Sequence, residues 1–146
     1  MVRPITKKYT NLARLGNVTT PYGGKTREES FHQGIDVANK NGTPIPSMSD
    51  GVVSNVVTGR KNGDNNFGNQ VEIKDNQGNT HTYSHLKDVM VKPGQQVKEG
   101  QVTMTMGDTG ASYSPSLGDS SHLDYRVRDA YLKYRDPLKV KKQKNG

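Results

Sequence analysis

The chain has 146 residues, a formal net charge of +7 and no cysteine. The length fits one domain, and the lack of thiols excludes disulfides, thiolate metal ligands and a cysteine nucleophile. No apolar run approaches the ~20 residues that a membrane span requires, so we expect no membrane span. The start of the chain lacks the apolar segment of a secretory signal, so we expect either a cytosolic chain, a mature fragment or delivery by another route.

Short valine-rich runs in which apolar residues alternate with polar ones predict β-strands, and the frequent glycines and asparagines between them predict turns. Residues 1–20 are polar and are interpreted as an N-terminal arm. Strands are expected at residues 51–58, 69–74, 80–85, 101–106 and 122–128, with a hairpin from Asp75 to Asn79 between the second and the third. The predicted fold class is all-β, with strongly curved, mainly antiparallel sheets and few short helical turns.

Three further segments complete the chain. Residues 107–121 form a long loop, which is expected to be one wall of a substrate groove or else a surface loop without that role. Residues 129–134 are expected to make a short helical turn. Residues 139–146 form a basic tail that is expected to be solvated, and because no aromatic residues lie among its lysines we do not expect nucleic acid as a partner.

Histidines and aspartates gather in three segments near the ends of strand candidates. The first holds His32 and Asp36, the second His85, and the third His122 and Asp124. Alternation along a strand places His122 and Asp124 on the same face. Imidazole and carboxylate both bind first-row metals, and a catalytic zinc site uses three protein ligands and a water, so the pattern favours a metal centre with additional proton-handling groups. His81 is interpreted as either a surface residue or a polar residue with its hydrogen bonds satisfied, without a role in the site.

In these residues the chain resembles the lysostaphin/LytM-type zinc endopeptidases, peptidase family M23. His32-Gln-Gly-Ile-Asp36 matches the family's HxxxD motif, and Tyr83-Ser-His85-Leu matches its Tyr-x-His-Leu strand end. His122-Leu-Asp124 stands where the family has HxH. The resemblance covers roughly residues 20–138, which sets a peptidase domain at residues 21–138 and implies the family's duplicated-hybrid-motif fold with a groove.

The resemblance also implies roles for five residues. His32 and Asp36 would be metal ligands, Asp124 would replace a histidine as the third ligand, and His85 and His122 would be the catalytic histidines. The implied cofactor is Zn²⁺, although oxygen-rich ligation also admits Mn²⁺ or Ca²⁺. The implied reaction is hydrolysis of the peptide cross-bridges of bacterial peptidoglycan, outside the cell or at the cell wall.

Asp124 leaves a second interpretation open. The domain could be catalytically degenerate and serve as a structural or cell-wall-binding component, for example in a bacteriophage tail tip, with tail proteins as partners and the virion as its location. The polar face of the last strand also carries Arg126 and Arg128, which either neutralise Asp124, line the groove or are ordinary strand-face residues.

Overall fold

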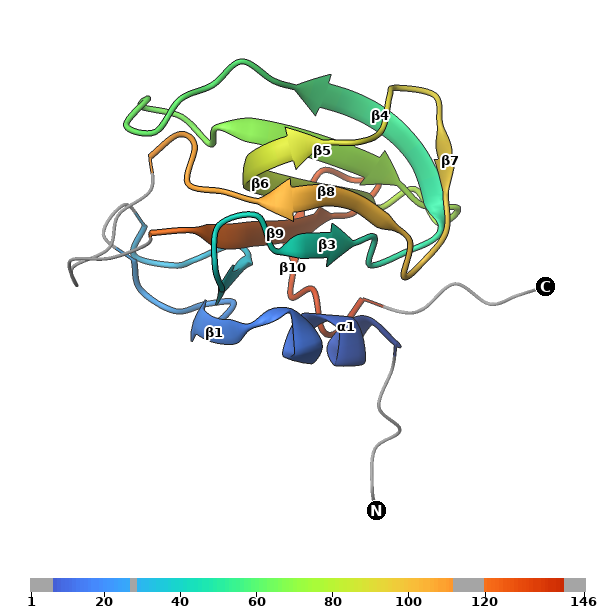
Figure 1. Ribbon diagram of the computed structural model, residues 1–146. Helices are drawn as coiled ribbons and strands as arrows, with labels where there is room; N and C mark the ends of the chain where they lie inside the picture. The colour runs from blue at the N-terminus through green and yellow to red at the C-terminus, as the bar shows by residue number, and fades with distance from the viewer. Residues whose placement is uncertain (1–6, 27–28, 112–119, 141–146) are drawn as a thin grey trace.

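A computed structural model describes residues 7–26, 29–111 and 120–140 of the chain. Within these ranges, ten strands form one sheet in which the paired strands run antiparallel, accompanied by a single helix (Figure 1). The elements are α1 (Lys7–Leu15), β1 (Asn17–Thr20), β2 (Ile35–Ala38), β3 (Pro44–Pro46), β4 (Gly51–Val57), β5 (Asn69–Lys74), β6 (Thr80–Val89), β7 (Gln96–Val97), β8 (Val102–Met106), β9 (His122–Arg128) and β10 (Tyr134–Arg135). The expected all-β antiparallel class is confirmed.

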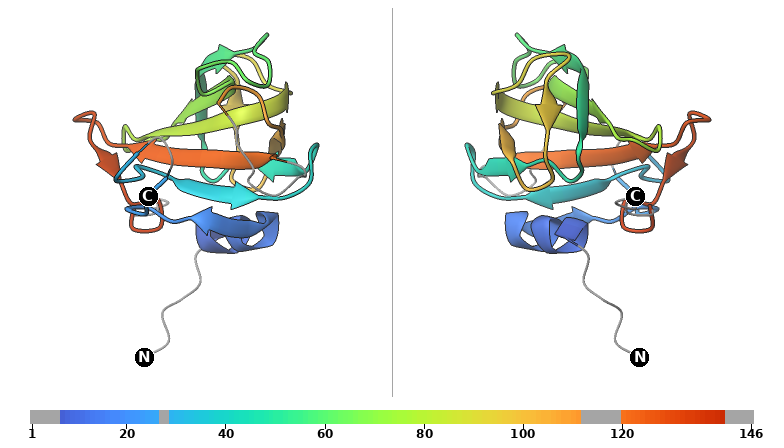
Figure 2. Two further views of the ribbon diagram at one scale, coloured as in Figure 1. Left: turned by 90° about the vertical axis from the view of Figure 1, so that its left-hand side faces the viewer. Right: turned by 90° about the vertical axis from the view of Figure 1, so that its right-hand side faces the viewer.

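The sheet is curved so that it packs against itself. Its main order is β1-β2-β9-β6-β5-β4-β7, and β10 pairs with β9. Strand β8 pairs with both β6 and β3 and so folds a second layer over the first (Figure 1). The views in Figure 2 place α1 and β4 at opposite ends of this curled sheet. Strands β2, β9 and β6 lie next to one another and carry Asp36, His85, His122 and Asp124, whereas His32 lies in the segment before β2.

The core fills the space between the two layers. Strand β9 shows how the pattern of the sequence decides which side chains enter it: Leu123, Tyr125 and Val127 are fully buried on the core face, as period-two alternation predicts. Asp124 and Arg126, on the opposite face, are also buried, at 3% and 6% exposure. That face is therefore covered by other parts of the chain and is not an ordinary solvated strand face.

The N-terminal stretch differs from the expected irregular arm. Residues Lys7–Leu15 form α1, and Leu12 and Leu15 are buried in the core cluster. Strand β1 then adds to the sheet beside β2. Burial of the two leucines explains why a polar segment is ordered here, because the helix gains most of its stability from packing. Helix α1, the single helix of the described residues, is neither long nor apolar enough to cross a membrane.

The predicted strands agree with the observed ones to within a few residues, apart from β6. That strand continues to Val89, four residues beyond the expected end, because its second half pairs with β8. Residues 129–133 make a turn that leads into β10 in place of a helical turn. Most of the predicted groove wall (residues 112–119) and most of the basic tail (residues 141–146) lie outside the described residues.

Of the two placements expected for His81, a surface residue or a satisfied polar one, the structure shows the second. Its ring is fully buried on the core side of β6, with Nδ1 2.7 Å from the Tyr125 hydroxyl and Nε2 2.9 Å from an Asp75 carboxylate oxygen. Burial alone would raise the pKa of Asp75, but hydrogen bonds from His81, Asn79 and Gln77 outweigh it and the net shift is downward. These hydrogen bonds connect the turn and strands of the β5–β6 hairpin to Tyr125 of β9.

Candidate metal centre

The register between β2 and β9 places two carboxylates directly opposite each other. Asp36 pairs with Asp124 across the two antiparallel strands, and Ala38 pairs with His122. Side chains in such pairs have Cβ atoms about 4.5–5.5 Å apart, and like charges in this arrangement are destabilising. A cation near both carboxylates would remove this penalty.

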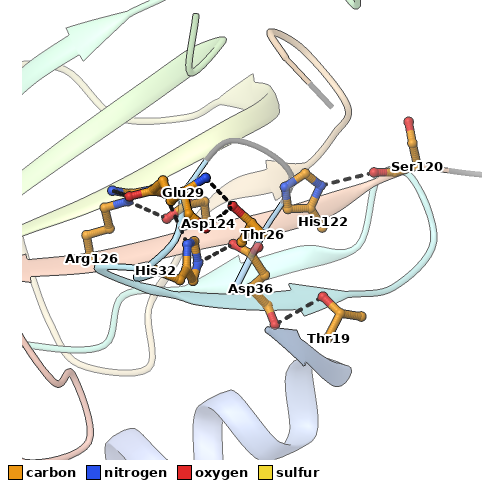
Figure 3. Close-up of polar contacts among 9 residues, drawn as sticks. All are labelled: Thr19, Thr26, Glu29, His32, Asp36, Ser120, His122, Asp124 and Arg126. Carbon is orange, nitrogen blue, oxygen red and sulfur yellow. Dashed lines mark hydrogen bonds and ion pairs between the residues drawn. The ribbon is translucent and has the colours of Figure 1, made fainter. Parts of the chain in front are cut away.

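His32 completes a cluster of three ligand-type side chains. One ligand atom from each of His32, Asp36 and Asp124 lies within 4.8 Å of the other two. The Nε2 atom of His32 is 2.9 Å from Oδ1 of Asp36. Figure 3 shows the three side chains pointing toward one another, from the segment before β2, from β2 and from β9. The structure therefore brings together the three residues expected to be metal ligands.

Glu29 fixes the orientation of the His32 ring from the other side. Its Oε1 atom lies 3.2 Å from Nδ1 of His32, so Nε2 is directed toward the two aspartates. Burial alone would lower the pKa of His32, but the hydrogen bond and charge of Asp36, with Asp124 and Glu29, outweigh it and raise the pKa. A carboxylate that holds the far nitrogen of an imidazole is the usual outer partner of a metal-bound histidine.

Arg126 contacts two of the three carboxylates around the cluster. Its Nε and one terminal nitrogen each donate to a different oxygen of Asp124, both at 2.9 Å. The same terminal nitrogen lies 2.7 Å from Oε1 of Glu29, and the other lies 3.3 Å from Oε2. Burial alone would lower the pKa of Arg126, but these carboxylates outweigh it and raise the pKa, so the guanidinium stays charged.

Gly34, inside the His32–Asp36 motif, gives this arrangement its space. A Cβ atom at Gly34 would lie 2.5 Å from Cγ of Arg126, 2.8 Å from the carbonyl oxygen of Tyr125 and 2.9 Å from Oδ1 of Asp124. Because one of these neighbours is backbone, the contact cannot be relieved by a side-chain rotation alone. The motif therefore needs glycine here for close packing of its loop against β9.

These residues fit a divalent metal ion. One imidazole and two carboxylates converge, and Glu29 holds the imidazole by its other nitrogen. Three carboxylates against one guanidinium, with a neutral His32, leave two negative charges, which one divalent cation balances. Compared with the two histidines and one carboxylate of some catalytic zinc sites, this cluster has a carboxylate in place of one histidine.

His85 lies at an irregular point of β6. The pairing of β5 with β6 shifts register between Asn69 and Val71, and His85 has a positive φ of 63°. Bulges and left-handed backbone at a residue other than glycine are often found at functional sites, where they redirect a side chain. Nδ1 of His85 lies 2.7 Å from the carbonyl oxygen of Thr109, so Nδ1 carries the proton and Nε2 is the proton-accepting atom.

His122 stands next to His85 at the start of β9. The two ring centroids are 4.5 Å apart, and Nδ1 of His122 lies 3.1 Å from the carbonyl oxygen of Ser120. Burial, followed by the charge of His122, lowers the pKa of His85. His85 follows Ser84, which pairs with Asp124 across β6 and β9, and the charges of Asp124 and Asp36 act to raise the pKa of His85.

The sequence did not indicate every residue of this centre. Glu29 was missed because it lies in a polar stretch without strand periodicity, and its spacing of three residues before His32 was the one available signal. Thr109 contributes a backbone carbonyl, which no sequence motif reveals. For Arg126, the option that it neutralises Asp124 is the one that the contacts support.

Comparisons with known proteins agree with this geometry. A model of peptidase family M23 matches residues 30–137. The peptidoglycan DD-endopeptidase ShyC of Vibrio cholerae is 39% identical over 93 residues, which are 63% of this chain and 20% of that protein. The murein hydrolase activator NlpD of Escherichia coli is 34% identical over 113 residues, which are 77% of this chain and 26% of that protein.

A solved structure gives the same result for the fold. The crystal structure of a zinc-containing peptidase from Vibrio cholerae is similar with a TM-score of 0.69 and 27% identity, over 88% of this chain and 37% of that one. The chain spans less than a third of the length of the curated relatives that it matches.

Proposed function

Because the chain belongs to peptidase family M23, we propose that it is a metal-dependent endopeptidase that hydrolyses peptide cross-bridges of bacterial peptidoglycan. The observation that carries the proposal is the convergence of His32, Asp36 and Asp124, with the paired rings of His85 and His122 beside them. The substrate class is supported by the relative named as a peptidoglycan endopeptidase. The positive net charge suits an anionic cell wall.

His32, Asp36 and Asp124 would hold the metal ion. When bound, a divalent cation supplies Lewis acidity that polarises a peptide carbonyl and lowers the pKa of a water molecule. We propose Zn²⁺ as the ion, and the two carboxylates also admit Mn²⁺. Glu29 keeps the His32 ring in the orientation that turns Nε2 to the ion.

The two remaining histidines would handle protons and the developing oxyanion. His85 is held by Thr109 through Nδ1, and its lowered pKa keeps the ring neutral at neutral pH, so Nε2 can accept a proton. His122 is oriented by the Ser120 carbonyl, and its ring centroid lies 4.5 Å from that of His85. Two imidazoles at this distance can divide the tasks of accepting a proton and stabilising an oxyanion.

One observation favours a second candidate function. Both oxygens of Asp124 already accept hydrogen bonds from Arg126, so the cluster has a partial charge balance without any metal. One of the relatives is named as a murein hydrolase activator. A non-catalytic domain that binds cell-wall peptides is therefore the alternative to the endopeptidase.

A digestion of isolated cell walls distinguishes the two candidates. The zinc-loaded protein is incubated with purified peptidoglycan, and turbidity and the mass spectra of the released fragments are followed. We expect turbidity to fall and new peptide amino termini to appear, and we expect His85→Ala to abolish both while Arg128→Lys retains them. Binding to the walls without any released fragment would reject the endopeptidase and favour the non-catalytic domain.

The proposed substrate also indicates where the domain acts. We propose that the domain acts outside the cytoplasm at the cell wall, in line with relatives named for murein and lipoprotein functions. Association with bacteriophage tail proteins stays a prediction. Mass spectrometry of purified virions and of host envelope fractions would test it, and detection in envelopes alone would contradict it.

A further inference from the structure

We propose that Arg126 is a positioning residue of the metal centre, which holds Asp124 in the one orientation where this shorter side chain can serve as the third ligand. The inference rests on the proposed metal site. An aspartate reaches less far from its strand than a histidine, so its carboxylate must be placed more accurately to share an ion with His32 and Asp36. Arg126 comes from the same strand and the same face, two residues further along.

The contacts between Arg126 and Asp124 determine the carboxylate plane. Each of the two carboxylate oxygens receives one hydrogen bond of 2.9 Å, from two different nitrogens of the guanidinium. Such a two-point contact fixes rotation as well as distance, which a single charge cannot do. A carboxylate has about four lone-pair positions, so each oxygen keeps one that can face a metal ion.

The guanidinium is itself held in place by its surroundings. Glu29 accepts from both of its terminal nitrogens, and the ring of Phe67 lies 4.8 Å from the guanidinium carbon. Arg126 is only 6% exposed, and Gly34 leaves just enough space for its stem. The side chain is therefore a rigid part of the site.

Through Glu29, the same guanidinium also reaches a second ligand. Glu29 contacts Arg126 and Nδ1 of His32, so one buried cation links the supports of two of the three ligands. Loss of its planar fork should loosen Asp124 and His32 together. Loss of its charge is a separate effect, because removing a positive charge by itself favours a cation nearby.

The test substitution at Arg126 keeps the positive charge and removes the planar guanidinium group. Arg126→Lys is compared with Arg128→Lys, a matched control on the same strand face, whose ion pair with Glu72 is long, at 3.9 Å. Zn²⁺ affinity is measured by competition with a chromogenic chelator, the visible spectrum of the Co²⁺-loaded protein reports ligand geometry, and thermal unfolding without metal reports folding. We expect Arg126→Lys to bind Zn²⁺ about 10–100-fold more weakly and to change the Co²⁺ spectrum, whereas Arg128→Lys matches the wild type.

Equal Zn²⁺ affinity and an identical Co²⁺ spectrum for Arg126→Lys would overturn the inference while the proposed function stands. A wild-type protein that binds no Zn²⁺ would overturn both. Should Arg126→Lys fail to fold, nuclear magnetic resonance of the wild type decides the matter. The Nε–H signal of Arg126 should be protected from exchange and should shift on addition of Zn²⁺, and a signal that Zn²⁺ leaves unmoved would overturn the inference.

Discussion

Replacement of Asp124 by histidine tests the coupling of this residue to Arg126. The change restores the HxH spacing at His122-Leu-Asp124, yet it removes a carboxylate that pairs with a buried guanidinium at 2.9 Å through both oxygens. Breaking a buried ion pair from one side costs about 3–5 kcal/mol, because the other charge is left uncompensated. Glu29 still contacts Arg126, so we expect the lower end, about 3 kcal/mol, for Asp124→His.

A second substitution should recover part of this loss. In Asp124→His with Arg126→Gln, the buried charge is gone and the amide can still donate to Glu29. We expect the double variant to lose about 0.5–3 kcal/mol less unfolding free energy than the two single changes lose in sum, the range seen for residues in contact.

The assay is urea unfolding of the metal-free proteins at a fixed pH, with a chelator present. Glu72→Gln serves as the control, since its partner Arg128 is 3.9 Å away and both are partly exposed, and its effect should stay within about 0.5 kcal/mol. If Asp124→His were as stable as the wild type, or if the two changes were additive, the coupling derived from the contacts would be refuted.

Three further predictions concern other parts of the molecule. Gly34→Ala should destabilise the fold by about 1–3 kcal/mol and weaken Zn²⁺ binding, because its Cβ would lie 2.8 Å from a backbone oxygen of β9; unchanged urea unfolding would contradict the packing argument. Tyr125→Phe removes the hydroxyl that lies 2.7 Å from the buried His81 and should lower the free energy of unfolding by about 1–3 kcal/mol while Zn²⁺ affinity is retained; a loss of Zn²⁺ binding in a folded variant would show that His81 is more than structural. The pKa of Asp75 is lowered in the folded protein, so its ionised form stabilises the fold when the pH is above the unfolded-state pKa of 3.8, and this stability is lost as the pH falls through the folded-state pKa. Asp75→Asn should therefore lose stability less steeply than the wild type below about pH 4. An acid-unfolding curve as steep as that of the wild type would contradict this prediction.

The sequence predicted those parts of the structure that depend on local pattern. Alternation along residues 122–128 correctly placed Leu123, Tyr125 and Val127 in the core and Asp124 on the opposite face. The Asp75–Asn79 turn also follows from local chemistry. These features need no knowledge of distant contacts, because the strand period alone decides which side faces the core.

Contacts between distant segments could not be predicted in the same way. The burial of Arg126 depends on Glu29, which lies 97 residues earlier in the chain, and on Phe67 in another loop. The bulge that sets His85 at a positive φ arises from the register of β5 against β6. Pairing register is set by the whole sheet. The positions of the residues that support the metal ligands, such as Glu29 and Arg126, are therefore visible only in the folded structure.

The most direct test of the metal centre is the amount of divalent ion that the folded protein binds. Isothermal titration with Zn²⁺, together with elemental analysis after dialysis, should give one ion per chain for the wild type and for Arg128→Lys, and none for a folded His32→Ala variant. A correctly folded wild-type protein that stays free of stoichiometric metal at saturating Zn²⁺ would contradict the account.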